Sequence, residues 1–124
     1  MRDITNRSDL EFLMAHFYEM LLNDDSINYI FTDIAQINLD EHLPHIVDFW
    51  EQNILNSGNY TNNVMKIHLA LNDKIRLTEA HFDIWLSHLY AAIDAYFLGE
   101  NAEKMKTRAL SIATVMKIKM QNHS

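Results

Sequence analysis

Cysteine is absent from this chain of 124 residues, which excludes disulfides, thiolate metal sites and cysteine nucleophiles. The two glycines and single proline are too few turn-forming residues for a β protein with many hairpins. No stretch approaches 18 uncharged apolar residues, and no apolar leader segment follows Met1, so we expect neither a membrane span nor a secretory signal. An apolar fraction of 48% supports a packed core. We therefore expect one all-α domain over residues 1–124.

Basic residues are scarce in the first half of the chain. Residues 1–60 hold 11 acidic and two basic side chains, and the whole chain has a formal net charge of −7. A surface that binds phosphates is normally basic, so nucleic acid is not an expected partner. The composition is that of a soluble protein, and we expect a cytoplasmic monomer or weak dimer.

Apolar residues recur at helical spacing along most of the chain. Ser8 with Glu11 resembles a capping box, and Thr78 is a suitable cap for a long helix. Pro44 is compatible with a helix only within its first turn, where no N–H is needed. The segment from Phe82 to Leu98 is apolar on nearly every face, which predicts a central helix. The pattern predicts six helical pieces, over residues 8–23, 27–37, 40–54, 64–71, 78–99 and 101–120.

Seven histidines make metal binding a necessary consideration. A carboxylate-bridged di-iron bundle would need Glu-x-x-His pairs on two helices, and the sequence has none. His42 and His45 would share one helical face, but such a pair is more often solvated than bound to zinc. The sequence also lacks the glycine-rich turns of a serine hydrolase or a phosphate-binding loop.

His68 is surrounded by apolar residues in the sequence, among them Val64, Met65, Ile67 and Leu69. The residues alone leave two readings open, a hydrogen-bonded core histidine or an axial haem ligand in an apolar slot. Such a slot needs large apolar walls, for which the candidates are Phe31, Ile46, Phe49, Trp50 and Phe97. It also needs polar atoms on the opposite side, which could come from Tyr18, His42 and Trp85.

Four motifs, taken in order, resemble those of the truncated haemoglobins. They are Phe17-Tyr18, the run from His42 to Phe49-Trp50, the run from Gly58 to His68, and the run from His81 through Trp85. The Phe-Trp pair, the histidine at position 42 and the scarcity of glycine resemble group III of that family. The similarity extends from about Ser8 to Met120.

This resemblance implies a globin-like two-over-two helical sandwich around one haem b (iron protoporphyrin IX). It implies that His68 is the proximal iron ligand, that Tyr18 and Trp85 donate hydrogen bonds to the bound gas, and that His42 is a gate or an additional donor. The haem contacts that it implies are Phe31, Ile46, Phe49, Trp50 and Met65. Phe97 is the further candidate for a wall of the haem pocket. The positive side chains expected near the haem propionates include Lys66, Arg76 and His81.

The function implied is reversible binding of O₂, NO or CO. Two or three donors would slow O₂ release and would also stabilise charge during O–O bond cleavage, which favours peroxidase-like or NO-oxidising chemistry. Such chemistry would require a separate reductase. Two alternatives stay open: a haem-based gas sensor that acts through a separate partner, and a helical interaction domain without a cofactor.

Overall fold

The part of the chain that can be described is almost entirely helical. The computed structural model describes residues 1–30, 39–55 and 78–123, and for Leu39 and residues 119–123 it describes the backbone alone. Within these ranges the chain has no strand. This confirms the expected all-α class. The helices are α1 (Arg7–Leu22), α2 (Leu39–Leu55), α4 (Glu79–Tyr96) and α5 (Glu100–His123).

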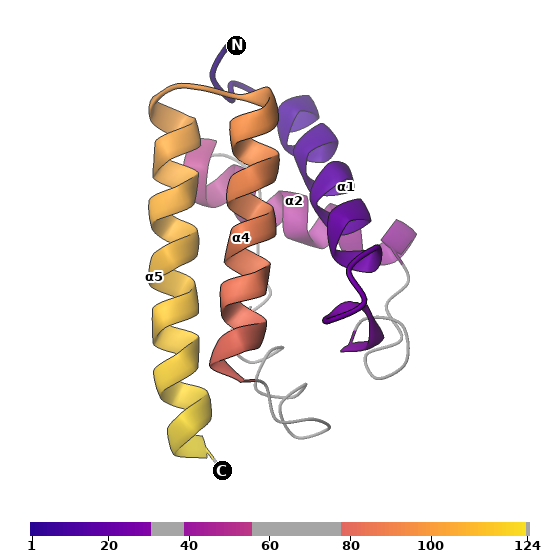
Figure 1. The fold of residues 1–124 in the computed structure, drawn as a ribbon. Helices are drawn as coiled ribbons and strands as arrows, with labels where there is room; N and C mark the ends of the chain where they lie inside the picture. The colour runs from indigo at the N-terminus through magenta and orange to yellow at the C-terminus, as the bar shows by residue number, and fades with distance from the viewer. Residues whose placement is uncertain (31–38, 56–77, 124) are drawn as a thin grey trace.

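The four helices pack as two pairs. Helices α4 and α5 lie side by side and antiparallel, α1 packs against α4, and α2 crosses so that it contacts both α1 and α5 (Figure 1). Each helix therefore has two helical neighbours, as the two-over-two arrangement requires. None of the helices in the described ranges is long and apolar enough to span a bilayer.

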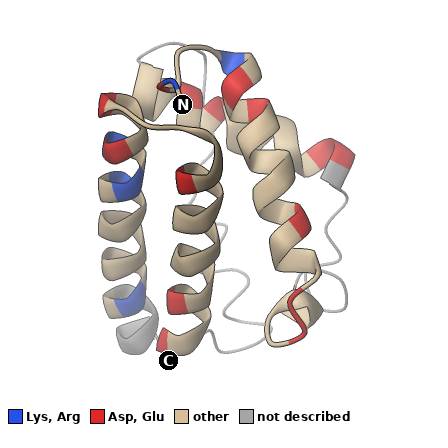
Figure 2. Ribbon diagram, turned by 45° about the horizontal axis from the view of Figure 1, so that its top comes forward, with Lys and Arg blue, Asp and Glu red and all other residues tan. Residues whose placement is uncertain are grey.

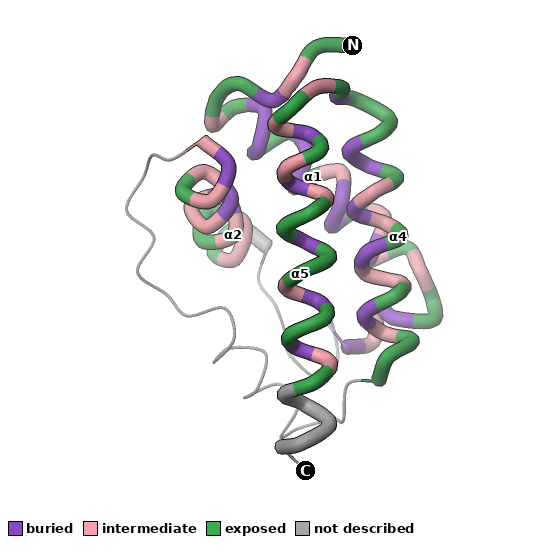
Figure 3. The backbone as a smooth tube through the Cα atoms, turned by 90° about the vertical axis from the view of Figure 1, so that its left-hand side faces the viewer, coloured by how far each residue is buried: buried purple, intermediate pink, exposed green. Residues whose placement is uncertain are grey.

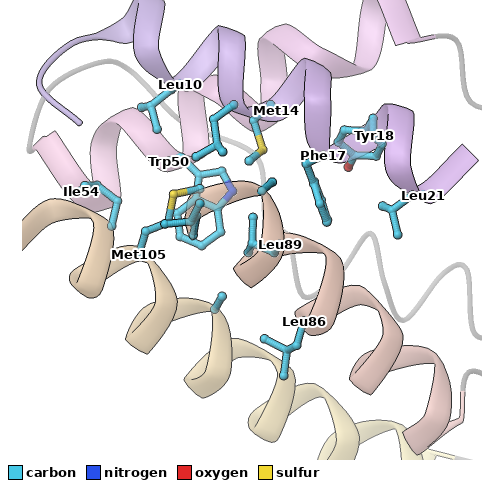
Figure 4. Close-up of a cluster of buried hydrophobic side chains, with 14 of the residues drawn as sticks. Leu10, Met14, Phe17, Tyr18, Leu21, Trp50, Ile54, Leu86, Leu89 and Met105 are labelled. Carbon is cyan, nitrogen blue, oxygen red and sulfur yellow. The ribbon is translucent and has the colours of Figure 1, made fainter. Parts of the chain in front are cut away.

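All four helices contribute side chains to one core. Figure 4 shows leucines and methionines of α1, α4 and α5 converging on Trp50 of α2. Over residues 100–118, one face of α5 is buried and the other is exposed (Figure 3). Met105, Ala109 and Met116 lie on this buried face, which agrees with the helical spacing of apolar residues in the helix predicted over 101–120. The side chain of Met120 lies outside the described residues.

Helix α4 lies between α1 and α5, as predicted for a central helix, and one of its faces is buried. Its buried side chains, Phe82, Leu86, Leu89, Ala92 and Ile93, form one face. Tyr96 is 39% exposed and Leu98 is 65% exposed. The helix ends at Tyr96, with Phe97 as its C-cap, rather than at Gly99. Packing on two neighbours buries one side of α4, while Ile84, Trp85 and Tyr90 are half-buried against the core.

Two of the predicted helix starts need correction. Asn6 rather than Ser8 caps α1, because the Asn6 side-chain oxygen accepts the N–H of Asp9 at 3.0 Å. Pro44 lies inside α2, beyond its first turn, since the helix begins at Leu39. Thr78 is the N-cap of α4, as predicted.

Ion pairs fix the crossing of α1 and α2. Nη1 of Arg7 lies 2.6 Å from Oδ1 of Asp48 and 3.0 Å from Oε1 of Glu51. Acidic residues are spread over α1, α2 and α4, whereas most basic residues in the described ranges lie on α5 (Figure 2). Arg7 is thus a rare positive charge among acidic neighbours, and it ties the start of α1 to the second half of α2.

The helices predicted over 27–37 and 64–71 fall partly or wholly outside the described residues. Residues 24–30 form a helical turn in which the N–H of Asn28 donates to the carbonyl of Asp24 at 2.8 Å. The structure describes nothing of 31–38 or 56–77.

Candidate functional site

Two polar side chains from different helices meet at one end of the core. The hydroxyl oxygen of Tyr18, in the last turns of α1, lies 2.7 Å from Nε2 of His42, in the first turns of α2. Their rings are 5.2 Å apart and nearly perpendicular. Tyr18 is only 5% exposed, and this burial raises the pKa of its phenol well above the ordinary value. The site therefore holds an uncharged phenol with one proton to donate.

Phe17 links Tyr18 to the third polar candidate, Trp85 of α4. The Phe17 ring lies 5.2 Å from the Tyr18 ring and 6.0 Å from the Trp85 ring, with edge-to-face geometry in both contacts. Phe17 is almost fully buried, whereas Trp85 is half-buried against the core. The structure thus brings the three predicted polar residues to one region from three helices.

A single stripe of α4 positions Trp85. His81, Trp85 and His88 follow each other at spacings of four and three residues, so they share one helical face. Nε2 of His81 lies 3.2 Å from the hydroxyl of Tyr29, and Nε2 of His88 lies 2.7 Å from Oδ2 of Asp24. Both histidines therefore attach the Trp85 face of α4 to residues 24–30. No local sequence pattern predicts either pairing, because the partners are 52 and 64 residues apart.

The hydrogen bonds around Asp24 favour the charged form of its carboxyl group. Hydrogen bonds from Ser26, and then from His88, lower the pKa of Asp24 to about 2. Asp24 is therefore a carboxylate at neutral pH, and it accepts a hydrogen bond from His88. The Nδ1 atom of His81 accepts the N–H of Thr78 at 3.1 Å and thereby helps to cap α4, and the expected placement of His81 near a propionate stays a prediction.

The predicted wall residues fall into two groups. Ile46 and Phe49 are half-buried and lie three residues apart on α2, on the turns that follow His42. Trp50 is 3% exposed and belongs to the central core, with its ring 5.1 Å from that of Phe49. Phe97 lies at the C-terminal end of α4, roughly 18 Å along the helix axis from Trp85. There it contacts Phe12 and Arg2, so the structure does not bring Phe97 to the Tyr18–His42 pair.

The remaining predicted site residues cannot be placed. Residues Phe31, Met65, Lys66, His68 and Arg76 lie outside the described residues. In the ranges that are described, no group of three or more histidine, aspartate or glutamate side chains converges as metal ligands would. His42 and His45 therefore gain no third ligand for zinc from that part of the chain.

Comparison with known proteins shows what the whole chain is similar to. The chain is 27% identical over 112 residues to a group 3 truncated haemoglobin of Campylobacter jejuni, which covers 88% of this chain and 86% of that protein. The structure matches the crystal structure of a group III truncated haemoglobin from Campylobacter jejuni with a TM-score of 0.85 and 25% identity, covering 100% of this chain and 98% of the other. The chain has the fold of the group III truncated haemoglobins. No family model matches it.

The described side chains fit the haem that a truncated-haemoglobin fold implies. A haem needs large apolar side chains around its flat ring and a few polar groups near the gas. Half-buried Ile46 and Phe49 supply apolar surface beside a buried, uncharged phenol. Tyr18 and His42 bring a hydroxyl and an imidazole together at one end of the core. Phe17 and Trp85 adjoin Tyr18, so the polar atoms gather in a small part of an apolar region.

Proposed function

We propose that this chain binds one haem b and holds a diatomic gas, O₂, NO or CO, beside Tyr18, His42 and Trp85. The observation that carries the proposal is the 2.7 Å contact between a phenol that is 5% exposed and an imidazole, in a fold shared with group III truncated haemoglobins. Burying a phenol and an imidazole at the end of the core costs free energy of desolvation that apolar side chains would not cost. Binding of a polar ligand at this position accounts for their presence.

The iron ligand in this proposal is His68, on the strength of its sequence motif. Phe31, Ile46, Phe49 and Met65 would contact the haem ring, and Lys66 and Arg76 would pair with its propionates. Of these residues, Ile46 and Phe49 have the half-buried placement that a haem contact needs. Trp50 would support the pocket from the core rather than line it, because it is almost fully buried.

The haem would supply an iron that binds the gas and transfers electron density to it. The chain's contribution is to position donors: the Tyr18 hydroxyl and the Trp85 indole N–H both stabilise negative charge in surroundings of low dielectric constant. Phe17 keeps both rings in place through its two edge-to-face contacts. The surrounding apolar side chains exclude water from these donors.

The same donors favour redox chemistry on the bound gas. A donor that stabilises partial negative charge in a complex also stabilises the charge that develops when an O–O bond breaks. We therefore extend the proposal to peroxide reduction or NO oxidation, with a separate reductase to restore ferrous iron. Multiple-turnover assays, one with peroxide and one with NO, O₂ and a chemical reductant, would test this extension. The rates of the parent protein would be compared with those of Tyr18→Phe.

An absorption spectrum of the purified protein after haemin addition tests the central proposal. We expect a stoichiometric Soret band that moves when the reduced protein binds CO. His68→Ala should weaken or abolish the band, whereas His45→Ala, an exposed histidine on α2, should leave it unchanged. Absence of the band in the parent protein would overturn the haem proposal.

A second measurement tests the role of Tyr18. Stopped-flow mixing should show O₂ release from Tyr18→Phe faster by roughly two- to tenfold, the range expected for the loss of one net hydrogen bond. Equal rates in the parent protein and the variant would remove Tyr18 as a donor while leaving haem binding intact.

A further inference from the structure

We infer that residues 24–30 hold the indole of Trp85 in its donor position through two hydrogen bonds to α4, an inference that rests on the proposed gas-binding function. One bond joins Asp24 to His88, and the other joins Tyr29 to His81. The four side chains are then positioning residues that act on the gas through Trp85.

The two bonds lie on either side of Trp85 along α4. His81 and His88 are seven residues apart, which is about 10 Å along the helix axis, and Trp85 lies between them on the same face. Their partners follow in the opposite order, because Asp24 contacts His88 and Tyr29 contacts His81. The segment therefore runs antiparallel to α4 and passes the turn that carries Trp85.

Asp24 both shapes this segment and attaches it to α4. Its Oδ1 atom accepts the N–H of Ser26 at 2.9 Å, and its carbonyl accepts the N–H of Asn28 at 2.8 Å. Its Oδ2 atom lies 2.7 Å from Nε2 of His88. Because hydrogen bonds from Ser26 and His88 lower the pKa of Asp24 to about 2, the acceptor is charged at neutral pH, and such hydrogen bonds are stronger than neutral ones. The bond to His88 thus fixes a turn whose shape is already set.

The position of the Trp85 indole depends on the side chains around it. Within the described part of the chain, its N–H has no hydrogen-bond partner and its ring contact is with Phe17. Ile27, which lies between the two bonded residues of the segment, is 2% exposed and belongs to the core against which Trp85 packs. Loss of a bond to α4 would let the segment move away from this face, so the indole would gain room to leave its donor position.

Substitution of His88 tests the shorter of the two bonds. His88→Leu removes the donor to Asp24 and should speed O₂ release by roughly two- to tenfold, the range expected for the loss of one net hydrogen bond from Trp85 to the gas. His88→Gln should restore the parent rate, because its amide can still donate to Asp24. An unchanged rate in His88→Leu, or a glutamine variant as fast as the leucine variant, would overturn the inference.

A matched control separates this role from a general loss of interhelical bonding. Lys117→Leu removes an ion pair of the same length, 2.7 Å, with Asp83. Asp83 is two residues from Trp85 and therefore on the opposite side of α4. Lys117→Leu should leave O₂ release unchanged, and an acceleration equal to that of His88→Leu would overturn the inference.

A double-mutant comparison tests whether His88 acts through Trp85. In the Trp85→Phe background, His88→Leu should not change the O₂ release rate. Equal acceleration in both backgrounds would show a route that does not involve the indole and would overturn the inference.

The ¹H–¹⁵N signal of the Trp85 indole reports its position whether or not haem is bound, and the signal is identified by its absence from Trp85→Phe. It should shift in His88→Leu and return towards its parent position in His88→Gln, while the signal of Trp50 in the core stays in place. An unchanged Trp85 signal would overturn the inference. A missing Soret band would instead overturn the haem proposal, so the two failures are distinguishable.

Tyr29→Phe keeps the inference testable if the His88 variants do not fold, because it removes one hydroxyl group and keeps the ring. This variant loses the second bond, the 3.2 Å contact with Nε2 of His81. Its Trp85 indole signal should shift and its O₂ release should be faster than that of the parent protein. The inference needs both bonds, so an unchanged Trp85 signal in Tyr29→Phe would overturn it.

Discussion

Tyr29 and His81 join the turn after α1 to the first turn of α4, with the Tyr29 hydroxyl 3.2 Å from Nε2 of His81. The other ring nitrogen, Nδ1, accepts the backbone N–H of Thr78 at 3.1 Å, so the neutral ring carries its proton on Nε2 and donates it to Tyr29. One imidazole thus caps a helix and ties it to a distant segment. Among the forms of the ring, only the uncharged tautomer with its proton on Nε2 makes both interactions at once, because protonation removes the acceptor at Nδ1.

This arrangement predicts a loss of stability on mild acidification. Burial lowers the pKa of His81 from its ordinary value, so the unfolded chain takes up the proton first as the pH falls. The contribution is complete above about pH 6.5 and declines as the pH falls towards the lowered value. We expect His81→Gln to reduce this part of the pH dependence of the urea midpoint between pH 7.5 and 5. A parallel decline in parent protein and variant would contradict the prediction, and exposed His45→Gln is the matched control.

Much of the fold could be predicted because helical periodicity reports burial directly. The cap at Thr78 and the buried stripe of α5 both follow from local patterns. The cap of α1 could not be predicted, because Asn6 and Ser8 are both suitable caps two residues apart. Contacts with the residues before the helix decide between them. The carboxylate of Asp9 accepts hydrogen bonds from Arg2 and from the N–H of Thr5, and Asn6 has the extended backbone conformation of an N-cap.

The candidate site shows a different limit. Periodicity places Tyr18 and His42 on their own helices but says nothing of a contact across 24 residues of sequence. The resemblance to truncated haemoglobins supplied that pairing as a common pocket, and the structure adds the hydrogen bond between the two side chains. For Phe97 the prediction rested on side-chain size alone, which suits the wall of a pocket. Its position at the end of α4 instead places it beside Phe12.

Asp9 predicts a second pH dependence, at strongly acidic pH. The hydrogen bond from Arg2, followed by those from Thr5, lowers the pKa of this buried carboxyl to about 2. Stability contributed by the charged form is therefore present above about pH 4 and is lost as the pH falls to about 2. The shift corresponds to about 2 kcal/mol, which Asp9→Asn should remove at pH 7 in urea unfolding. Exposed Glu11→Gln is the control, and an equal loss from both variants would refute the special role of Asp9.

Gly99 and Asp3 predict a steric coupling at the start of α5. Gly99 has φ +152°, and a Cβ added there would overlap the Asp3 carboxyl group, including Oδ2 at 2.7 Å. That carboxylate accepts the N–H groups of Asn101 and Ala102, both at 2.9 Å, and so caps the helix. Gly99→Ala should therefore cost about 1–3 kcal/mol through backbone strain and loss of the cap.

The Asp3→Ala background separates these two costs. With the carboxylate already absent, Gly99→Ala should cost less than in the parent protein, because the overlap with the carboxyl group and the loss of its cap no longer contribute, while the backbone strain and the overlap with Cβ of residue 3 stay. Thermal unfolding of the four proteins gives the coupling. A cost of Gly99→Ala that does not depend on residue 3 would show that Asp3 is not displaced.

Phe17 predicts how the pocket donors respond to a change behind them. Phe17→Leu removes the ring that contacts both Tyr18 and Trp85, so both side chains gain freedom to leave their donor positions. Loss of buried aromatic contacts should cost about 1–2 kcal/mol of stability. Phe82→Leu is a suitable control, because Phe82 is also a buried phenylalanine and lies on the core face of α4. If Phe17 positions the donors, Phe17→Leu should release O₂ faster than Phe82→Leu at similar stability. In the Tyr18→Phe background, the difference in release rate between the two leucine variants should shrink, because only the contact of Phe17 with Trp85 is left to lose. Equal release rates for the two leucine variants would mean that the donors are held by other contacts and that Phe17 serves the core alone.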